Sequence, residues 1–132
     1  MAVAVPASFF GVKYDASRYP GNTKGGIRHG ANCQSFAYAF LKHFGRTIPD
    51  FRSSELWDDT VYTAKQKTLK PLDLLLFNKS RKAYGAHVAV YLGSNKAIHL
   101  SKEVGYPTIW DLKDFKKRKK YTFFLGAKRV RK

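Results

Sequence analysis

One segment of the chain carries apolar residues at helical spacing. Its apolar face consists of Phe36, Ala37, Phe40, Leu41 and Phe44, a recurrence typical of an amphipathic α-helix. Asn32 is a favourable N-cap, Gly45 is a favourable C-terminal stop, and Pro49 prevents simple continuation of the helix. The pattern therefore predicts a helix near residues 32–44, with Cys33 in its first turn.

The second half of the chain has patterns typical of β-strands. The expected strands are residues 73–78, 87–92, 97–101, 108–112 and 121–130. Residues 93–96 have the composition of a turn that joins two of them. An irregular loop at residues 15–31 and a weaker helical stretch at residues 53–65 come earlier in the chain. Helices followed by an antiparallel sheet indicate an α+β fold.

Composition places the chain among folded proteins. It has 132 residues, of which 44% are hydrophobic and 15% aromatic. Disordered segments have few aromatic residues and little apolar surface to bury. We therefore expect one domain over residues 1–132, a length that supports a single core.

The chain is strongly basic, with 25 Lys and Arg residues against 9 Asp and Glu, a formal charge of +16. Basic runs at residues 116–120 and 127–132 are expected to be a solvated turn and tail, because no recognisable nucleic-acid-binding motif accompanies them. An anionic polymer or surface is therefore favoured as a partner over a specific nucleic acid. No apolar run is long enough for a transmembrane segment, and residues 1–10 lack a charged leader, so localisation stays open.

Cys33 is the only cysteine, which excludes an intramolecular disulfide and a multi-thiolate metal site. The four histidines show no ligand-pair spacing, and no metal or cofactor is expected. A helix N-terminus favours the thiolate form of a cysteine. A lone cysteine is more often a small buried hydrophobe, but the position of Cys33 after a glycine-rich loop favours a nucleophile.

His87 and His99 are the candidate partners of this thiol. His87 opens one predicted strand, and His99 follows twelve residues later on the next. Each histidine alone is more simply structural. Together with Cys33 they have the residue types of a nucleophile, a general base and a residue that orients the base.

Several segments resemble one known family. Residues 30–49, GANCQSFAYAFLKHFGRTIP, are similar to its Asp-Cys-Ser-Gly-Phe helix, and residues 69–77, LKPLDLLLF, to its Leu-x-Pro-Gly-Asp-Leu strand. Residues 87–101, HVAVYLGSNKAIHLS, are very close to its His-Val-Gly-Ile-Tyr-Leu-Gly hairpin, and LGAKRV resembles its C-terminal end. The family is NlpC/P60, papain-like cysteine peptidases that mostly cut peptide stems of bacterial cell walls. Four motifs in order over about a hundred residues make chance similarity a poor explanation.

The resemblance implies a papain-like fold and a role for each matching residue. Cys33 would be the nucleophile, His87 the general base and His99 the residue that orients His87. Tyr14 would line the site, with Tyr19 as its rival. The implied reaction is amide hydrolysis through a thioester acyl-enzyme, with oxyanion donors at the start of the Cys33 helix, on a peptidoglycan-like substrate in a secreted or wall-associated setting.

The chain departs from the family pattern around the nucleophile. Asn32 replaces Asp, Gln34 replaces Ser, and Ser35 replaces Gly. Asn32 can still cap the helix, but Asn32 and Gln34 stand where the family holds the stem peptide, so substrate recognition is expected to differ. Leu72 replaces a glycine before Asp73, which would alter a turn beneath the site.

Strand geometry alone does not bring the two histidines together. A three-residue loop at residues 94–96 would pair Tyr91 with His99 and leave His87 four residues away, roughly 13 Å at about 3.3 Å per residue. A slip of one residue would put the histidines on opposite faces, although a bulge could shorten the distance. The role of His99 therefore rests on the resemblance.

Two other functions remain open for this sequence. The same Cys–His pair could serve another acyl transfer, such as that of an amidase, a deamidase or an acyltransferase. The chain could also be a catalytically idle basic module that binds polyanions. Thiol reactivity and Cys33-dependent products would separate these alternatives.

Overall fold

Six strands form one antiparallel sheet in the order β1-β6-β2-β3-β4-β5. The computed structural model describes residues 3–131. The strands are β1 (Thr63–Gln66), β2 (Leu74–Asn78), β3 (His87–Gly93), β4 (Lys96–His99), β5 (Thr108–Asp111) and β6 (Phe123–Val130). The helices are α1 (Cys33–His43), α2 (Ser53–Asp58) and α3 (Leu112–Lys116), with short 3-10 turns η1 (Ala7–Gly11), η2 (Ile27–His29) and η3 (Lys119–Tyr121). The predicted α+β fold is confirmed.

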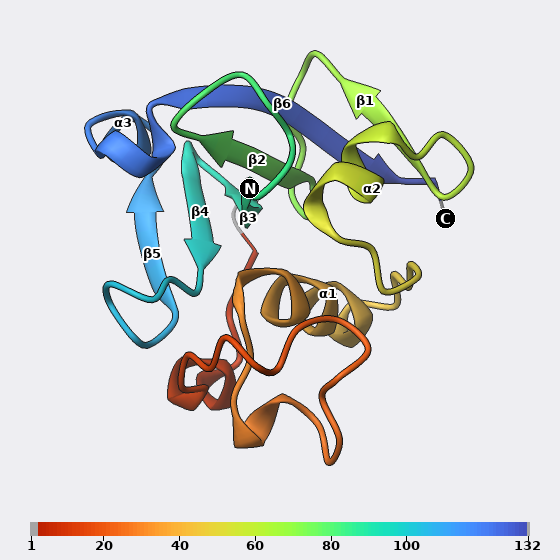
Figure 1. The fold of residues 1–132 in the computed structure, drawn as a ribbon, viewed down its shortest axis with the longest axis vertical. Helices are drawn as coiled ribbons and strands as arrows, with labels where there is room; N and C mark the ends of the chain where they lie inside the picture. The colour runs from red at the N-terminus through yellow and green to blue at the C-terminus, as the bar shows by residue number, and fades with distance from the viewer. Residues whose placement is uncertain (1–2, 132) are drawn as a thin grey trace.

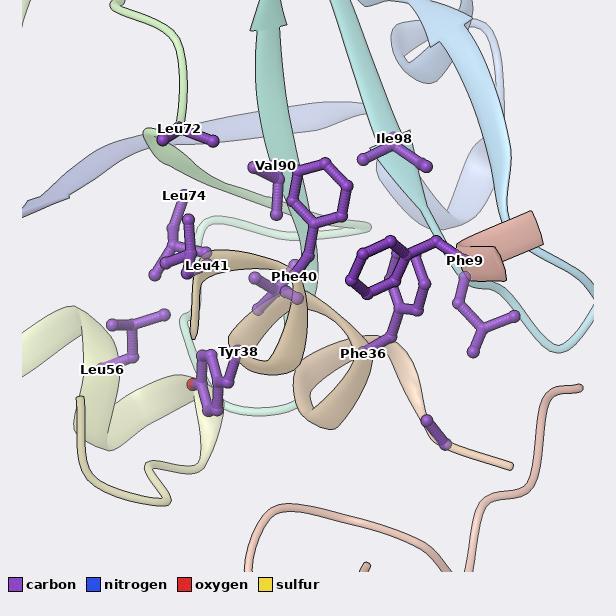
Figure 2. Close-up of a cluster of buried hydrophobic side chains, with 14 of the residues drawn as sticks. Phe9, Phe36, Tyr38, Phe40, Leu41, Leu56, Leu72, Leu74, Val90 and Ile98 are labelled. Atoms are coloured by element: carbon purple, nitrogen blue, oxygen red, sulfur yellow. The ribbon is translucent and has the colours of Figure 1, made fainter. Parts of the chain in front are cut away.

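Helix α1 begins as the sequence predicts, and its predicted apolar face is buried except for Phe44, which is exposed at the C-cap. The Asn32 side chain accepts hydrogen bonds from the backbone N–H groups of Gln34 and Ser35, and the Ser35 hydroxyl accepts one from the Asn32 N–H, which completes a capping box. The helix lies against one side of the sheet, with the N-terminal segment beyond it (Figure 1). Phe40 points toward Val90 of β3 in a shared buried core (Figure 2). The capping box thus sets the start of the helix at Cys33.

The helix predicted at residues 53–65 is wrong beyond Asp58. The Asp59 carboxylate accepts hydrogen bonds from the backbone N–H groups of Val61, Tyr62 and Thr63, which turns the chain out of the helix. Residues 63–66 then form β1 and pair with β6. The pairing partner lies far away in the sequence, so tertiary contacts override the weak local helical preference.

The loop at residues 15–31 is irregular, as predicted, apart from the 3-10 turn η2. Arg18 organises it, because its guanidinium donates hydrogen bonds to the carbonyl oxygens of Gly30, Lys24 and Gly26. The Ser35 hydroxyl of α1 also donates to the Arg18 carbonyl at 2.6 Å. One hydrogen-bond network therefore joins the loop to the first turn of the helix.

The β3–β4 hairpin has a two-residue turn instead of the three-residue loop considered from the sequence. Ser94 and Asn95 have φ angles of 53° and 61°, the left-handed values that a type I′ turn requires. The register pairs Val90 with Ile98, but Gly93 with Lys96, so one extra β3 residue, Leu92, forms a bulge.

This bulge decides which way the two histidines face. Continued from Val90 and Ile98, the register places His99 opposite Ala89, two residues from His87 and on the same face. The separation along the strand falls to about 7 Å, which is typical of diagonal neighbours. Without the extra residue the histidines would face opposite sides.

The other side of the sheet is covered by α3 and η3. Leu75, Phe77, Ala89, Tyr91, Ala97 and Ala127 pack there with Phe115 and Tyr121. The basic run 116–120 is exposed, as predicted, but is not all turn: it joins α3 to η3, and the Arg118 guanidinium lies 4.3 Å from the Trp110 ring centroid. None of the helices within residues 3–131 has the length and apolar character needed to cross a membrane.

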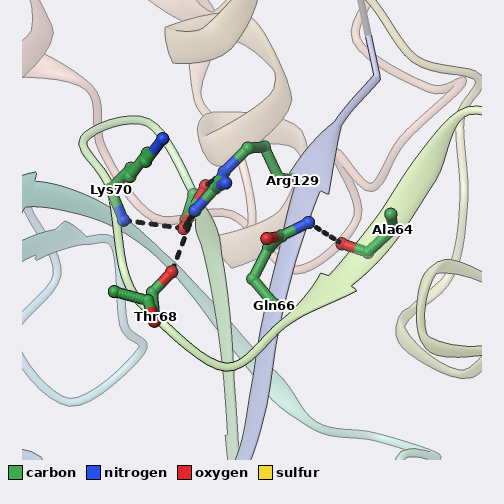
Figure 3. Close-up of polar contacts among 6 residues, drawn as sticks. Ala64, Gln66, Thr68, Lys70 and Arg129 are labelled. Atoms are coloured by element: carbon green, nitrogen blue, oxygen red, sulfur yellow. Dashed lines mark hydrogen bonds and ion pairs between the residues drawn. The ribbon is translucent and has the colours of Figure 1, made fainter.

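A buried ion pair fixes the turn before β2. Asp73 is fully buried, and its carboxylate accepts hydrogen bonds from the Arg129 guanidinium at 2.7 and 2.9 Å and from the Lys70 backbone N–H at 2.9 Å. Figure 3 shows Arg129 of β6 beside Lys70 and Thr68. Leu72, where the family pattern has glycine, adopts a φ of 76°, a region that costs a non-glycine residue energy.

Candidate active site

A cleft of about 380 Å³ lies where the N-terminus of α1 meets the start of β3. Cys33, the first residue of α1, and His87, the first residue of β3, both line it. Tyr14 and Gln34 line the same cleft. The structure therefore brings these four sequence-predicted residues to one place.

His99 lies next to His87 and not in the cleft itself. The His87 Nε2 and His99 Nδ1 atoms are 2.8 Å apart, a hydrogen-bond distance. His99 is 1% exposed, and its Nε2 atom has no hydrogen-bond partner within the described part of the chain. The rings of Trp110 and Phe115 lie 4.1 and 4.6 Å from the His99 ring, centroid to centroid. This aromatic pocket fixes the plane of His99.

Burial favours the neutral forms of all three side chains. The Cys33 thiol is partly exposed through the cleft, yet loss of hydration raises its pKa to about 11. The backbone N–H groups of Val88, Gln34 and Cys33 act in the opposite direction, with a smaller effect. Burial lowers the pKa of His87 to about 3 and that of His99 to about 2, the latter aided by repulsion from His87 and Arg118. Burial therefore disfavours the charged form of each side chain, whereas the helix N-terminus alone favours a thiolate.

The first turn of α1 offers fewer free N–H donors than a helix start usually does. Those of Gln34 and Ser35 bond to the Asn32 side chain, and that of Phe36 bonds to the Asn32 carbonyl. The Cys33 N–H bonds to no oxygen or nitrogen within residues 3–131 and lies close enough to its own sulfur to lower the thiol pKa. In this turn the Cys33 N–H is therefore the backbone donor that is free to bind an oxyanion.

Tyr14, and not Tyr19, lines the cleft that contains Cys33. A parallel bridge joins Tyr14 to Ala31 just before the helix, and the Tyr14 N–H donates to the Gly105 carbonyl at 2.8 Å. Burial raises the pKa of Tyr14, and the nearby Cys33 raises it further. The phenol therefore stays protonated at neutral pH and can donate a hydrogen bond.

Asn32 and Gln34 occupy different positions relative to the cleft. Asn32 lines an adjoining cleft of about 450 Å³, together with Tyr19 and Arg52, while its side chain caps α1. Gln34 lines both clefts. A substrate could therefore contact Asn32 only if it extended past Gln34 into the adjoining cleft.

Sequence reasoning missed the aromatic residues that support the histidines. Tyr121 lines the cleft, and Trp110 packs on His99. Tyr121 follows a basic run and Trp110 lies in a short strand, so neither has a local pattern that distinguishes it from a core residue.

No group of three or more His, Cys, Asp and Glu side chains within residues 3–131 is arranged to hold a metal ion. A larger hollow of about 640 Å³ lies on another side of α1, near Lys42 and Asp50. Neither Cys33 nor His87 lines it. The chemistry-bearing side chains therefore gather in the smaller cleft.

Comparisons with known proteins point to one family. The NlpC/P60 family model matches residues 16–121. The protein named murein DD-endopeptidase MepS/murein LD-carboxypeptidase of Escherichia coli (strain K12) is 32% identical over 100 residues, which is 75% of this chain and 47% of that protein. The chain thus spans about half the length of this curated relative.

Solved structures show the same fold. An NlpC/P60 family protein from Bacillus cereus ATCC 10987 has a TM-score of 0.67 at 23% identity, covering 96% of this chain and 41% of that one. The NlpC/p60 domain of the peptidoglycan hydrolase SagA has a TM-score of 0.59 at 20% identity, covering 94% and 90%. At these identities the likeness concerns the fold.

Proposed function

The chain belongs to the NlpC/P60 family, and from that premise we propose that it is a cysteine-dependent peptidase that hydrolyses an amide bond in cell-wall peptides. The single observation that carries this proposal is the convergence of Cys33 and His87 on one cleft, with His99 bonded behind His87. The name of the Escherichia coli relative, a murein endopeptidase, supports the substrate class. The single sheet also supports one domain over residues 1–132.

His87 is the general base. Its Nε2 atom is engaged with His99, so Nδ1 is the nitrogen left to take the thiol proton. A protonated His87 needs an acceptor for its Nε2–H, and His99 Nδ1 supplies one when the His99 proton is on Nε2. His99 thus orients the base and stabilises the imidazolium that forms during attack.

The bond changes follow from this arrangement. Cys33 Sγ loses its proton to His87 and attacks the amide carbonyl carbon, and the resulting oxyanion accepts hydrogen bonds from the Cys33 N–H and the Tyr14 hydroxyl. The C–N bond breaks as His87 returns the proton to the leaving amine, which leaves a thioester on Cys33. Water, deprotonated by His87, attacks the thioester and releases a carboxylic acid and the free thiol.

Because the resting pair is neutral, proton transfer accompanies attack. Substrate that fills the cleft displaces water, which strengthens the attraction between the developing imidazolium and the negative charge that moves from sulfur to the carbonyl oxygen. In the transition state this attraction offsets the desolvation cost that raises the thiol pKa in the free protein. This order requires no thiolate in the free protein.

Digestion of purified peptidoglycan tests the proposal. Wild type is expected to release peptides that carry one added water, identified by mass spectrometry, whereas Cys33→Ala releases none. His87→Ala is expected to lower the rate by about 10²- to 10⁴-fold, the usual contribution of a general base. His29→Ala is a matched control, because His29 does not line the cleft. Absence of any Cys33-dependent product would overturn the peptidase assignment.

The same products separate the two alternatives. Release of ammonia without chain cleavage would indicate a deamidase, and transfer of the acyl group to an added amine in preference to water would indicate an acyltransferase. Salt-sensitive binding of peptidoglycan that is equal in wild type and Cys33→Ala, without any product, would indicate an idle binding module.

A further inference from the structure

Three lysines line the cleft that contains Cys33, and each comes from a different segment. Lys79 follows β2, Lys102 follows β4, and Lys120 lies in η3. We name these three residues the lysine rim. All three are exposed, and none forms a salt bridge within the part of the chain that the structure describes.

No Asp or Glu residue lines the same cleft. Two acidic residues outside the lining act on its tyrosines: Asp15 raises the pKa of Tyr14, and Glu103 raises that of Tyr121. Two lysines outside the cleft do have carboxylate partners, since Lys96 binds Asp111 at 2.6 Å and Lys117 lies 3.6 Å from Asp114. The lysine rim therefore concentrates uncompensated positive charge around a concave surface.

Like charges gathered in this way repel one another, and a cleft with protein walls focuses their field. An anion bound in the cleft would relieve this repulsion. The adjacent Cys33 and His87 act on acyl groups, and phosphodiesters contain none, so a carboxylate fits the site better than a nucleic-acid backbone does. Lysine, a flexible point charge, suits a carboxylate whose position varies.

We propose that the lysine rim selects substrates that bear a free carboxylate next to the scissile amide. The proposal rests on the hydrolase function proposed for the cleft and adds the charge of its substrate. It also gives a role to part of the basic run 116–120, through Lys120, whereas Arg118 is stacked on Trp110. Long-range attraction from the rest of the +16 surface is a separate, non-selective effect.

Muropeptides with native or blocked carboxylates provide the test. Soluble fragments from a muramidase digest are used as prepared, or after carbodiimide coupling of their carboxyl groups to ammonia. Wild type is expected to show a kcat/KM about tenfold or more higher on the native fragments, a sum of several modest ion-pair contributions. The triple variant Lys79→Gln, Lys102→Gln, Lys120→Gln is expected to lose this preference, so that its kcat/KM values on native and blocked fragments become equal.

A control variant separates the lysine rim from overall charge. Lys42→Gln, Lys113→Gln, Lys116→Gln removes the same number of charges from residues that line other hollows. It is expected to keep the preference for native fragments. Equal loss in the two triple variants, or equal rates on native and blocked fragments in wild type, would overturn the proposal.

Binding measurements test the carboxylate preference of the lysine rim without turnover. Calorimetric titration of Cys33→Ala with native and blocked fragments is expected to give tighter binding of the native form, and the lysine-rim substitutions are expected to abolish the difference. If binding shows this selectivity but no Cys33-dependent product forms, the hydrolase function fails and the carboxylate preference stands. If neither form binds better, the carboxylate preference fails whatever the activity.

Discussion

The ring of Tyr121 is stacked on the ring of His87, with centroids 4.5 Å apart and planes inclined by 26°. Tyr121 is 6% exposed and lines the cleft beside His87. The tyrosine therefore closes one side of the imidazole, while His99 holds its Nε2 atom. Two contacts from outside β3 together fix the orientation of the proposed base.

Loss of this stacking is expected to reduce activity through His87. Tyr121→Leu should lower kcat by about tenfold, because a misoriented base forfeits part of its contribution, with a smaller change in KM. Tyr121→Phe keeps the ring and should retain most of the activity. Peptidoglycan digestion by the two variants checks this, and an equal loss in both would assign the effect to the hydroxyl.

The bond between His87 and His99 predicts a graded response at position 99. His99→Leu should reduce kcat by about ten- to a hundredfold, because the Nε2–H of protonated His87 then lacks an acceptor. His99→Asn offers a carbonyl oxygen and should recover part of the loss. Rates for both variants, with thermal unfolding as a check on folding, test this; full activity of His99→Leu would remove His99 from the mechanism.

The raised pKa of Cys33 predicts slow alkylation at neutral pH. Burial disfavours the thiolate, so its fraction should grow only as the pH rises toward about 11. The rate of iodoacetamide labelling, followed by intact mass between pH 6 and the alkaline limit of stability, measures this. In urea the same thiol should titrate near the ordinary value of about 8.5.

A labelling midpoint below the ordinary value would contradict the neutral pair. It would mean that attraction between the thiolate and protonated His87, together with the positive end of α1, exceeds the cost of desolvation. In that case His87→Ala should raise the midpoint. For the neutral pair, His87→Ala should leave the midpoint almost unchanged and still reduce hydrolysis.

The buried pair of Asp73 and Arg129 lies away from the cleft, and its disruption is expected to lower the stability of the fold. Asp73→Asn should lower the free energy of unfolding by about 2–3 kcal/mol, because it weakens charge-assisted bonds to a fully buried carboxylate. Asp111→Asn breaks an exposed pair with Lys96 and should cost much less, because solvent screens the attraction. Urea unfolding of both variants makes the comparison, and similar losses would contradict a special role for burial.

The sequence determined the local features of this protein. Asn32, the apolar stripe after Cys33 and Gly45 predicted α1, because capping and helical periodicity depend only on nearby residues. The alternation after His87 predicted β3 for the same reason. Strand β1 was missed, since its pairing with β6 joins residues far apart in the chain. The motifs identified the family, but not the contacts among the proposed catalytic residues.

The tertiary structure decided whether His87 and His99 meet. A bulge at Leu92 and a two-residue turn at Ser94 and Asn95 set the register that places both rings on one face. A shift of a single residue would separate them, and no local propensity reports such a shift. Packing likewise raises the pKa of Cys33, because hydration of the thiol depends on the side chains that the whole fold brings around it.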